Sequence, residues 1–278
     1  LYVALGIKSR ACLAEGDWDG AFKAAKRVID EGGYAVGTKS DLTGGMNSLD
    51  KQNVMWGAGI QVADQAGGYA GFFTHMDNKE GAYAKSAPKL ISKQLYNRIS
   101  ATDIRRDWWD PSDKESPYVS KKFSFANVAS FLGDYIYMRV EEMYFTAAEA
   151  ALRLDDLKSA RELMNTVMAE RDPGYSANNR SGTLLGATTT TWTGSFLENI
   201  LTHRRIELWG EYGRLFDVRR LGQGIDRRTD DGFSEECISM MNRRNVNITK
   251  ADTYDWVLTI PKAELDANPN INEEDQNP

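Results

Sequence analysis

Residues 11–21 read Ala-Cys-Leu-Ala-Glu-Gly-Asp-Trp-Asp-Gly-Ala, and residues 150–160 repeat the same pattern as Ala-Ala-Leu-Arg-Leu-Asp-Asp-Leu-Lys-Ser-Ala. Each stretch ends an apolar helical segment, passes through a short acidic turn, and places a large apolar residue three positions before an alanine. Asp17 and Asp156 stand where a side chain can accept the unpaired backbone N–H groups of the next helix. Two helices with a short turn between them and alanines at their crossing are typical of tetratricopeptide-like hairpins.

The spacing of apolar residues extends this pattern along the chain. One helix face is marked by Val140, Tyr144, Ala147, Ala151 and Leu154. We therefore expect helical hairpins at about residues 1–31 and 138–171 and a long helix at about 196–221. A lone hairpin cannot bury its apolar faces, so further helices are expected to pack against these.

Residues 33–137 differ from the hairpins in composition. Glycines interrupt a stretch rich in Tyr and Phe, and residues 53–56, 118–123 and 256–261 resemble short strands. The sequence predicts one domain over residues 1–278. Its predicted class is mostly α (α+β), with tetratricopeptide-like helical hairpins, an irregular loop-rich face and short strands.

Composition excludes several classes of function. The 278 residues carry a formal net charge of −6, whereas a nucleic-acid surface normally needs a basic patch. A zinc site needs about four ligands, and the chain has only two histidines and two cysteines. We expect Cys12 and Cys237 to be small buried apolar groups, with a disulfide as the alternative. No metal or cofactor is implied.

Three motifs resemble one known family. Residues 139–150 are similar to the pattern R-x-x-E-x-Y-x-x-x-A-E-A, and residues 203–220 to E-R-R-x-E-L-x-x-E-G-x-R-x-x-D-L-x-R, with His203 where Glu is usual. The tail resembles I-P-x-x-E-x-x-x-N-P followed by Q-N-P. Together these motifs resemble the SusD/RagB family of outer-membrane nutrient-binding proteins.

The resemblance implies a function without bond chemistry. A member of this family binds oligosaccharides or polysaccharides at the surface of the bacterial outer membrane and delivers them to a TonB-dependent barrel of the SusC type. The intact protein would be a surface-exposed lipoprotein, held to the membrane only by a lipid anchor. We expect this chain, which opens inside a helical pattern, to be a C-terminal portion whose anchor lies in a missing N-terminal part.

The helix at 203–220 mixes acids and bases, which invites a catalytic interpretation. Apolar residues are interleaved with these charges, so more than one face of the helix is expected to be buried. We interpret the charges as a structural ion-pair network with Arg139, Glu142 and Glu149. The spacing predicts that Arg214 pairs with Glu211 and with Asp217.

Two other functions stay open. A tetratricopeptide-like scaffold would bind proteins through its helices without glycan contact. A glycoside hydrolase would need two carboxylates at a defined separation in a cleft, and no acidic pair is singled out by its surroundings. The sequence also lacks a G-x-S-x-G elbow and a phosphate-binding G-x-x-x-x-G-K-[ST] loop.

Sugar binding calls for flat aromatic faces and planar polar side chains. A glycine-rich segment offers both, and its glycines indicate exposed loops. The candidate glycan-binding residues are Tyr69, Phe72, Phe73, Asp77, Asn78 and Tyr83, with Trp192 in a threonine-rich loop. We expect Trp18, Trp56, Trp209 and Trp256 to be packing residues, and at least one of Trp108 and Trp109 to lie in the core.

Overall fold

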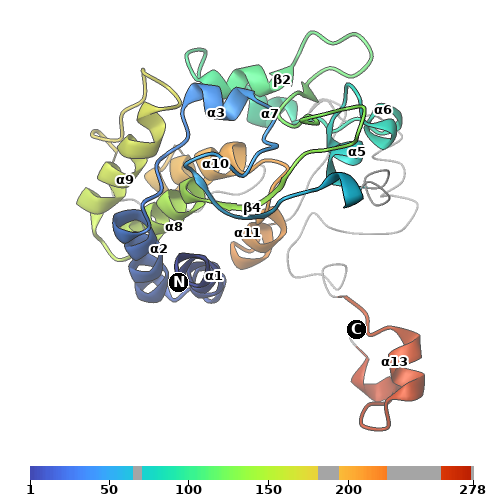
Figure 1. The fold of residues 1–278 in the computed structure, drawn as a ribbon. Coiled ribbons are helices and arrows are strands. Elements are labelled where there is room, and N and C mark those ends of the chain that lie inside the picture. Colours follow the sequence, from blue (N-terminus) through green and yellow to red (C-terminus); the bar gives the residue numbers. More distant parts are fainter. Residues whose placement is uncertain (65–70, 181–193, 224–257, 277–278) are drawn as a thin grey trace.

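Helices form most of the regular structure in the computed structural model, which describes residues 1–64, 71–180, 194–223 and 258–276 (Figure 1). The longer helices are α1 (Tyr2–Glu15), α2 (Trp18–Glu31), α8 (Val140–Arg153), α9 (Leu157–Ala169), α10 (Phe196–Glu207) and α11 (Arg214–Arg220). The shorter helices are α3 (Lys39–Thr43), η1 (Val62–Asp64), α5 (Phe72–Met76), α6 (Ala82–Ser86), α7 (Lys93–Tyr96), η2 (Ile104–Trp108), α13 (Lys262–Ala267) and η5 (Glu273–Asp275). The predicted mostly helical α+β class is confirmed.

The two repeated sequences form two helix pairs, α1 with α2 and α8 with α9. Asp17 accepts a hydrogen bond from the Gly20 amide at 2.9 Å, and Asp156 accepts one from the Ser159 amide at 3.0 Å. Each aspartate therefore satisfies an unpaired donor in the first turn of its helix. Helix α2 packs on both α1 and α8, so the two pairs form one stack (Figure 1).

Small side chains let these helices approach closely. Ala21, Ala25 and Ala147 are completely buried. The main apolar core fills the space between α2, α8, α9 and α10, while a second core of Trp, Tyr and Phe side chains lies under the loop-rich face. Cys12 is buried and free, as expected of a small apolar group, and Cys237 lies outside the described residues. Within the described ranges, no helix is long and apolar enough to cross a membrane.

The strands form two antiparallel pairs. Strand β1 (Val54–Ala58) pairs with β4 (Tyr135–Arg139), and β2 (Trp109–Asp110) pairs with β3 (Val119–Ser120). Strand β3 is shorter than the predicted strand at 118–123. Of the strand expected at 256–261, the described residues 258–261 form no strand.

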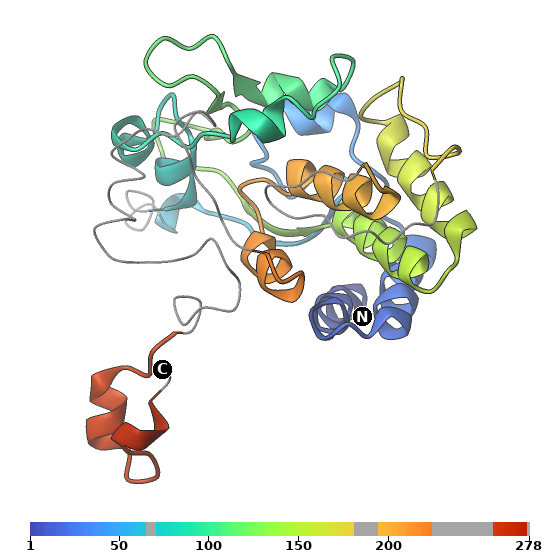
Figure 2. The same cartoon turned by 180° about the vertical axis from the view of Figure 1, so that it is seen from behind.

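The prediction of one long helix at 196–221 is wrong, because the structure divides this segment into α10 and α11 (Figure 2). The backbone turns at Gly210 (φ 74°) and Gly213 (φ 111°), conformations that favour glycine. The buried Lys122 ammonium donates to the carbonyls of Glu207 and Trp209 at 2.7 and 2.9 Å. A continuous helix would need these two carbonyls for its own hydrogen bonds, so Lys122 stabilises the break.

A buried ion-pair network lies around Glu207 at the end of α10. The Glu207 carboxylate accepts hydrogen bonds at 3.0–3.1 Å from three guanidinium groups, and all four side chains are fully buried; the donors are Arg105, Arg139 and Arg171. Burial raises the pKa of Glu207, but these three cations outweigh it and hold the pKa well below its ordinary value. Glu207 thereby ties α10 to η2, β4 and the end of α9.

A second group of ion pairs joins α11 to α8. Asp217 accepts hydrogen bonds from Arg204 and Arg220, and Arg220 also binds Glu149. The structural interpretation of the charged helix is thus confirmed, but the predicted pairs of Arg214 are wrong. Asp217 is already bound by two other arginines, and Arg214 forms no ion pair with the described residues.

We predict that Glu207→Gln destabilises the protein by about 3–5 kcal/mol, the typical cost of removing one partner from a buried ion pair. Three buried guanidinium groups would lose their shared counter-charge. Urea denaturation followed by circular dichroism measures this loss. Glu162→Gln, which breaks the exposed pair with Lys158, serves as the matched control and should change stability by less than about 0.5 kcal/mol. Equal effects of the two substitutions would contradict the prediction.

A second prediction concerns His203, which is buried and whose Nδ1 lies 2.8 Å from Arg105 Nη2. Burial, together with the charge of Arg105, holds the pKa of His203 well below 6.5. Below about pH 6.5 the unfolded chain binds a proton at His203 that the folded chain does not. Stability should therefore fall with decreasing pH, at a limiting slope of about 1.4 kcal/mol per pH unit from this one group.

Urea titrations between pH 6.5 and 5 measure that slope. His203→Gln should reduce the slope, whatever it does to the stability itself. His75→Gln, at an exposed position on α5, is the control and should leave the slope unchanged. A slope that is the same in the wild type and in His203→Gln would contradict the prediction.

Candidate functional site

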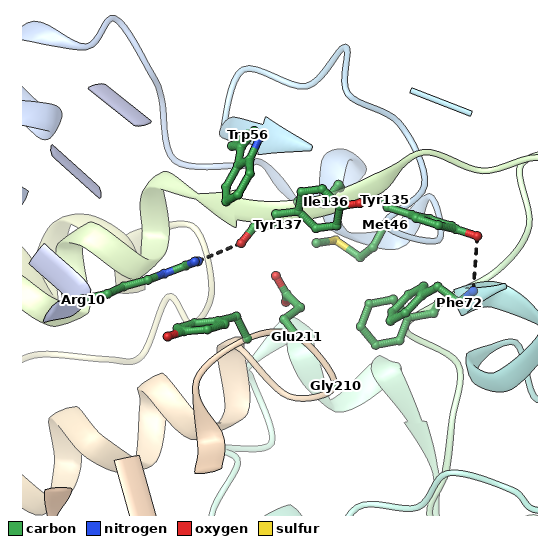
Figure 3. A pocket seen from close by; sticks show the side chains of 11 residues that line it. Arg10, Met46, Trp56, Phe72, Tyr135, Ile136, Tyr137, Gly210 and Glu211 are labelled. Carbon is green, nitrogen blue, oxygen red and sulfur yellow. Dashed lines mark hydrogen bonds between the residues drawn. The ribbon is translucent and has the colours of Figure 1, made fainter. Parts of the chain in front are cut away.

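A pocket of about 450 Å³ opens between the β1–β4 ribbon, α5 and the connection from α10 to α11 (Figure 3). Its lining is mostly aromatic and aliphatic, and Arg10 reaches it from α1. The lining residues are Arg10, Met46, Trp56, Phe72, Phe123, Tyr135, Ile136, Tyr137, Gly210, Glu211 and Tyr212.

Three exposed aromatic rings, which we call the aromatic mouth, surround the opening. Trp56, Tyr137 and Tyr212 are 42%, 41% and 37% exposed, unusually high for large rings. The rings of Trp56 and Tyr137 meet edge to face with their centroids 5.2 Å apart. Strand geometry explains the exposure of Trp56, because successive side chains point to opposite faces and the neighbouring Met55 is buried.

Arg10 holds two sides of the mouth together. Its guanidinium donates to both oxygens of Glu142 at 2.8 and 2.7 Å and to the carbonyl of Tyr137 at 2.7 Å (Figure 3). The same group lies 3.7 Å over the centre of the Tyr212 ring, a cation–π contact. The break between α10 and α11 places Tyr212 here, since it falls between the two glycines of positive φ.

The inner part of the pocket, which we call the apolar floor, is formed by Met46, Phe72, Phe123 and Ile136. Met46 is 6% exposed and Phe123 is 3% exposed, so these two are the most buried of the four. The Phe72 and Phe123 rings meet at right angles with their centroids 5.2 Å apart. The Phe72 amide donates to the Tyr135 hydroxyl at 3.3 Å, which fixes the edge of the floor.

The one carboxylate in the lining, Glu211, is bound by two cations. One oxygen accepts from Lys122 at 2.5 Å and from Arg139 at 2.8 Å, and the other accepts from Arg139 at 2.8 Å. Burial raises the pKa of Glu211, but Arg139 and Lys122 hold it below its ordinary value. Burial also lowers the pKa of Lys122 to about 8. Glu211 is therefore a fixed anion with three of its roughly four acceptor positions already used.

The structure separates the residues that the sequence grouped as a glycan site. Phe72 lines the pocket, but Phe73 is only 2% exposed and belongs to the aromatic core, so its ring offers no accessible face. Tyr83 is 38% exposed and stacks in parallel on His75, with centroids 4.6 Å apart. Tyr69 and Trp192 lie outside the described residues.

Asp77 and Asn78 border a different hollow of about 890 Å³, and both have structural partners. Asp77 accepts from the amides of Lys79, Glu80 and Phe125 at 2.9–3.0 Å. Asn78 donates to the Ser120 carbonyl and accepts from the Lys89 amide, both at 2.8 Å. The polar atoms that we expected to bind sugar hydroxyls therefore already stabilise loops.

Sequence reasoning missed the aromatic mouth. It assigned Trp56 to packing, whereas the structure exposes it, and it did not single out Tyr137 or Tyr212. Alternation along the strand was the available signal, because a buried Met55 requires an outward Trp56. Trp108 and Trp109 are both buried, as predicted for at least one of them, and Trp256 lies outside the described residues.

In the described ranges, no three His, Cys, Asp or Glu side chains are grouped so that they could hold a metal ion.

Comparison with known proteins places the fold. Residues 110–278 match the model of the SusD family, and no curated protein matches the chain. A SusD-like carbohydrate-binding protein from Bacteroides vulgatus is 26% identical over 97% of this chain, with a TM-score of 0.76. A SusD superfamily protein from Bacteroides thetaiotaomicron is 23% identical over 100%, with a TM-score of 0.74. A protein from Bacteroides vulgatus described as a putative sugar-binding protein is 24% identical over 100%, with a TM-score of 0.69.

This chain spans 58%, 60% and 59% of the length of those three structures. The family model covers more than half of the chain, and the similar folds extend over nearly all of it. The chain belongs to the SusD family.

Proposed function

We propose that this chain binds glycans through the aromatic mouth and takes no part in bond cleavage. The observation that supports this most directly is the grouping of Trp56, Tyr137 and Tyr212, all exposed, around one pocket. Large exposed apolar surfaces on a soluble fold typically mark an interaction site. A sugar ring has an apolar C–H face and a polar edge, so it fits an aromatic face bordered by hydroxyl and indole N–H groups.

The family supports the same ligand class. The Bacteroides vulgatus relative with 26% identity is described as a carbohydrate-binding protein, and it matches nearly the whole of this chain. A tetratricopeptide-like scaffold, the main alternative, would use its helical surfaces instead of the pocket.

The charges in the pocket favour binding over hydrolysis. A glycoside hydrolase needs two carboxylates beside the scissile bond, one of them able to give up a proton. Glu211 is the one carboxylate among the lining residues, and Arg139 and Lys122 keep it ionised and occupied. A side chain in this state is a poor acid and a poor nucleophile.

The proposed location and partner rest on the family and not on the pocket. We propose that the whole protein is a surface lipoprotein of the bacterial outer membrane. It would pass oligosaccharides to a TonB-dependent barrel of the SusC type.

Tyr83 is a second proposed contact for a longer glycan. Its ring is 38% exposed and stacks on His75, and an exposed ring of this kind can contact a sugar. Phe72 contributes from the floor of the pocket, while Tyr69 and Trp192 remain predictions from the sequence.

The test is isothermal titration calorimetry with a panel of soluble plant and microbial polysaccharides. Aromatic stacking of a base is worth about 1–3 kcal/mol per ring, and a sugar face offers less polarisable surface. We therefore expect Trp56→Ala to weaken binding of the best ligand about tenfold, or about 1.4 kcal/mol. Tyr83→Ala should weaken only the longer glycans.

Phe131→Ala is the matched control, because this ring is also 42% exposed but does not line the pocket. It should leave the affinity unchanged. If Trp56→Ala folds normally and binds as tightly as the wild type, the pocket is not the site. If no glycan in the panel binds, the scaffold alternative becomes the better account.

A further inference from the structure

We propose that the pocket selects neutral sugars that carry a small acyl group, such as an O-acetyl ester, and that it rejects uronic acids. This proposal rests on the glycan-binding function and adds the chemical class of the ligand. Two features carry it: the pairing of both charges in the lining, and the lack of hydrogen-bonding groups in the apolar floor.

The first feature is that both charges among the described lining residues already have a counter-charge. Arg10 is paired with Glu142 through Nε and Nη2, Nη2 also donates to the Tyr137 carbonyl, and the face of the guanidinium covers Tyr212. Glu211 is held by Lys122 and Arg139. A uronate entering the pocket would leave water without gaining a cation, which disfavours its binding.

The second feature is that the polar groups of the pocket gather at its mouth. The hydroxyls of Tyr137 and Tyr212 and the indole N–H of Trp56 belong to exposed side chains, and no hydrogen bond to another described residue engages them. These groups suit the hydroxyl-bearing edge of a sugar ring stacked on the mouth. Such groups are absent from the four side chains of the apolar floor, of which Met46 and Phe123 are the most buried.

The four side chains of the floor can pack against carbon but cannot form a hydrogen bond with a hydroxyl group. The side chains of Met46, Phe72, Phe123 and Ile136 carry no nitrogen or oxygen, and the Tyr135 hydroxyl, which accepts from the Phe72 amide, lies at the edge of the floor. A sugar hydroxyl placed against these side chains would lose its water partners without replacement. An acetylated hydroxyl has no donor to satisfy, and its methyl group matches the floor. The volume of about 450 Å³ lies within the ~300–1,000 Å³ of typical ligand pockets.

The probes are acetylated xylan, the same xylan after alkaline deacetylation, acetylated and deacetylated galactoglucomannan, and polygalacturonate. Microscale titration of the folded chain gives each affinity. At least one acetylated polymer should bind tenfold or more tightly than its deacetylated form, and polygalacturonate should bind no better than the deacetylated polymers.

Ile136→Thr tests the floor, since it puts a hydroxyl at a half-buried lining position and removes one terminal methyl group, as the control does at its own position. This variant should bring the two forms of the polymer within about twofold of each other while deacetylated polymer still binds. Ile29→Thr, at a half-buried position on α2 away from the pocket, is the matched control and should keep the tenfold preference.

The outcomes separate this inference from the function on which it rests. Equal wild-type affinity for the acetylated and deacetylated forms of both polymers would overturn the selection and leave glycan binding intact. Tight binding of polygalacturonate that Trp56→Ala weakens would overturn the exclusion of acids. Failure of every probe to bind would overturn both the inference and the proposed function.

Discussion

The rest of this structure depends on the buried ion pairs of the Glu207 carboxylate. This carboxylate lies fully buried among Arg105, Arg139 and Arg171, which come from a short 3₁₀ helix, the end of a strand and the end of a helix hairpin. Apolar packing alone is nondirectional, and it would allow the loop-rich face to slide over the helices. Buried charges do not allow this, because each must keep its partner at hydrogen-bonding distance.

The same cluster of charges leads to the pocket. Arg139 binds both Glu207 and Glu211, and Lys122 binds Glu211 together with the carbonyls at the end of α10. The contacts of Lys122 lie at the end of α10. The turn between α10 and α11 then carries Tyr212 to the mouth. The position of Tyr212 at the mouth is thus a consequence of how a buried lysine and a buried arginine are satisfied.

The sequence predicted the parts of this molecule that depend on local spacing. The aspartate caps and the alanine crossings of the hairpins follow from residues a few positions apart, and the structure has them where expected. The network around Glu207 was predicted in kind and in one partner, Arg139, but not in the other two. Arg105 and Arg171 are distant in sequence, and no periodicity connects them to α10.

The candidate site was harder to predict because a glycine can mark either an exposed loop or a close approach between two backbone segments. Gly81 was interpreted as the mark of an exposed loop, yet a side chain there would meet carbonyl oxygens of α5 at 2.5–2.8 Å. This glycine allows close backbone approach, and the same compactness buries Phe73 and occupies Asp77. In strand β1, by contrast, Trp56 points outward because it alternates with the buried Met55. This alternation between neighbouring residues can be recognised in the sequence.

The exposure of Trp56 bears on how such proteins diversify. An outward ring on a two-stranded ribbon adds little to the core, and the ribbon is bulged on both sides of Trp56, so its backbone tolerates irregularity. Substitutions at the mouth would therefore be nearly neutral for folding, while those at Glu207 would not. After gene duplication, one copy could acquire specificity for a different glycan by changing a few exposed aromatic residues, while its buried ion pairs stay unchanged.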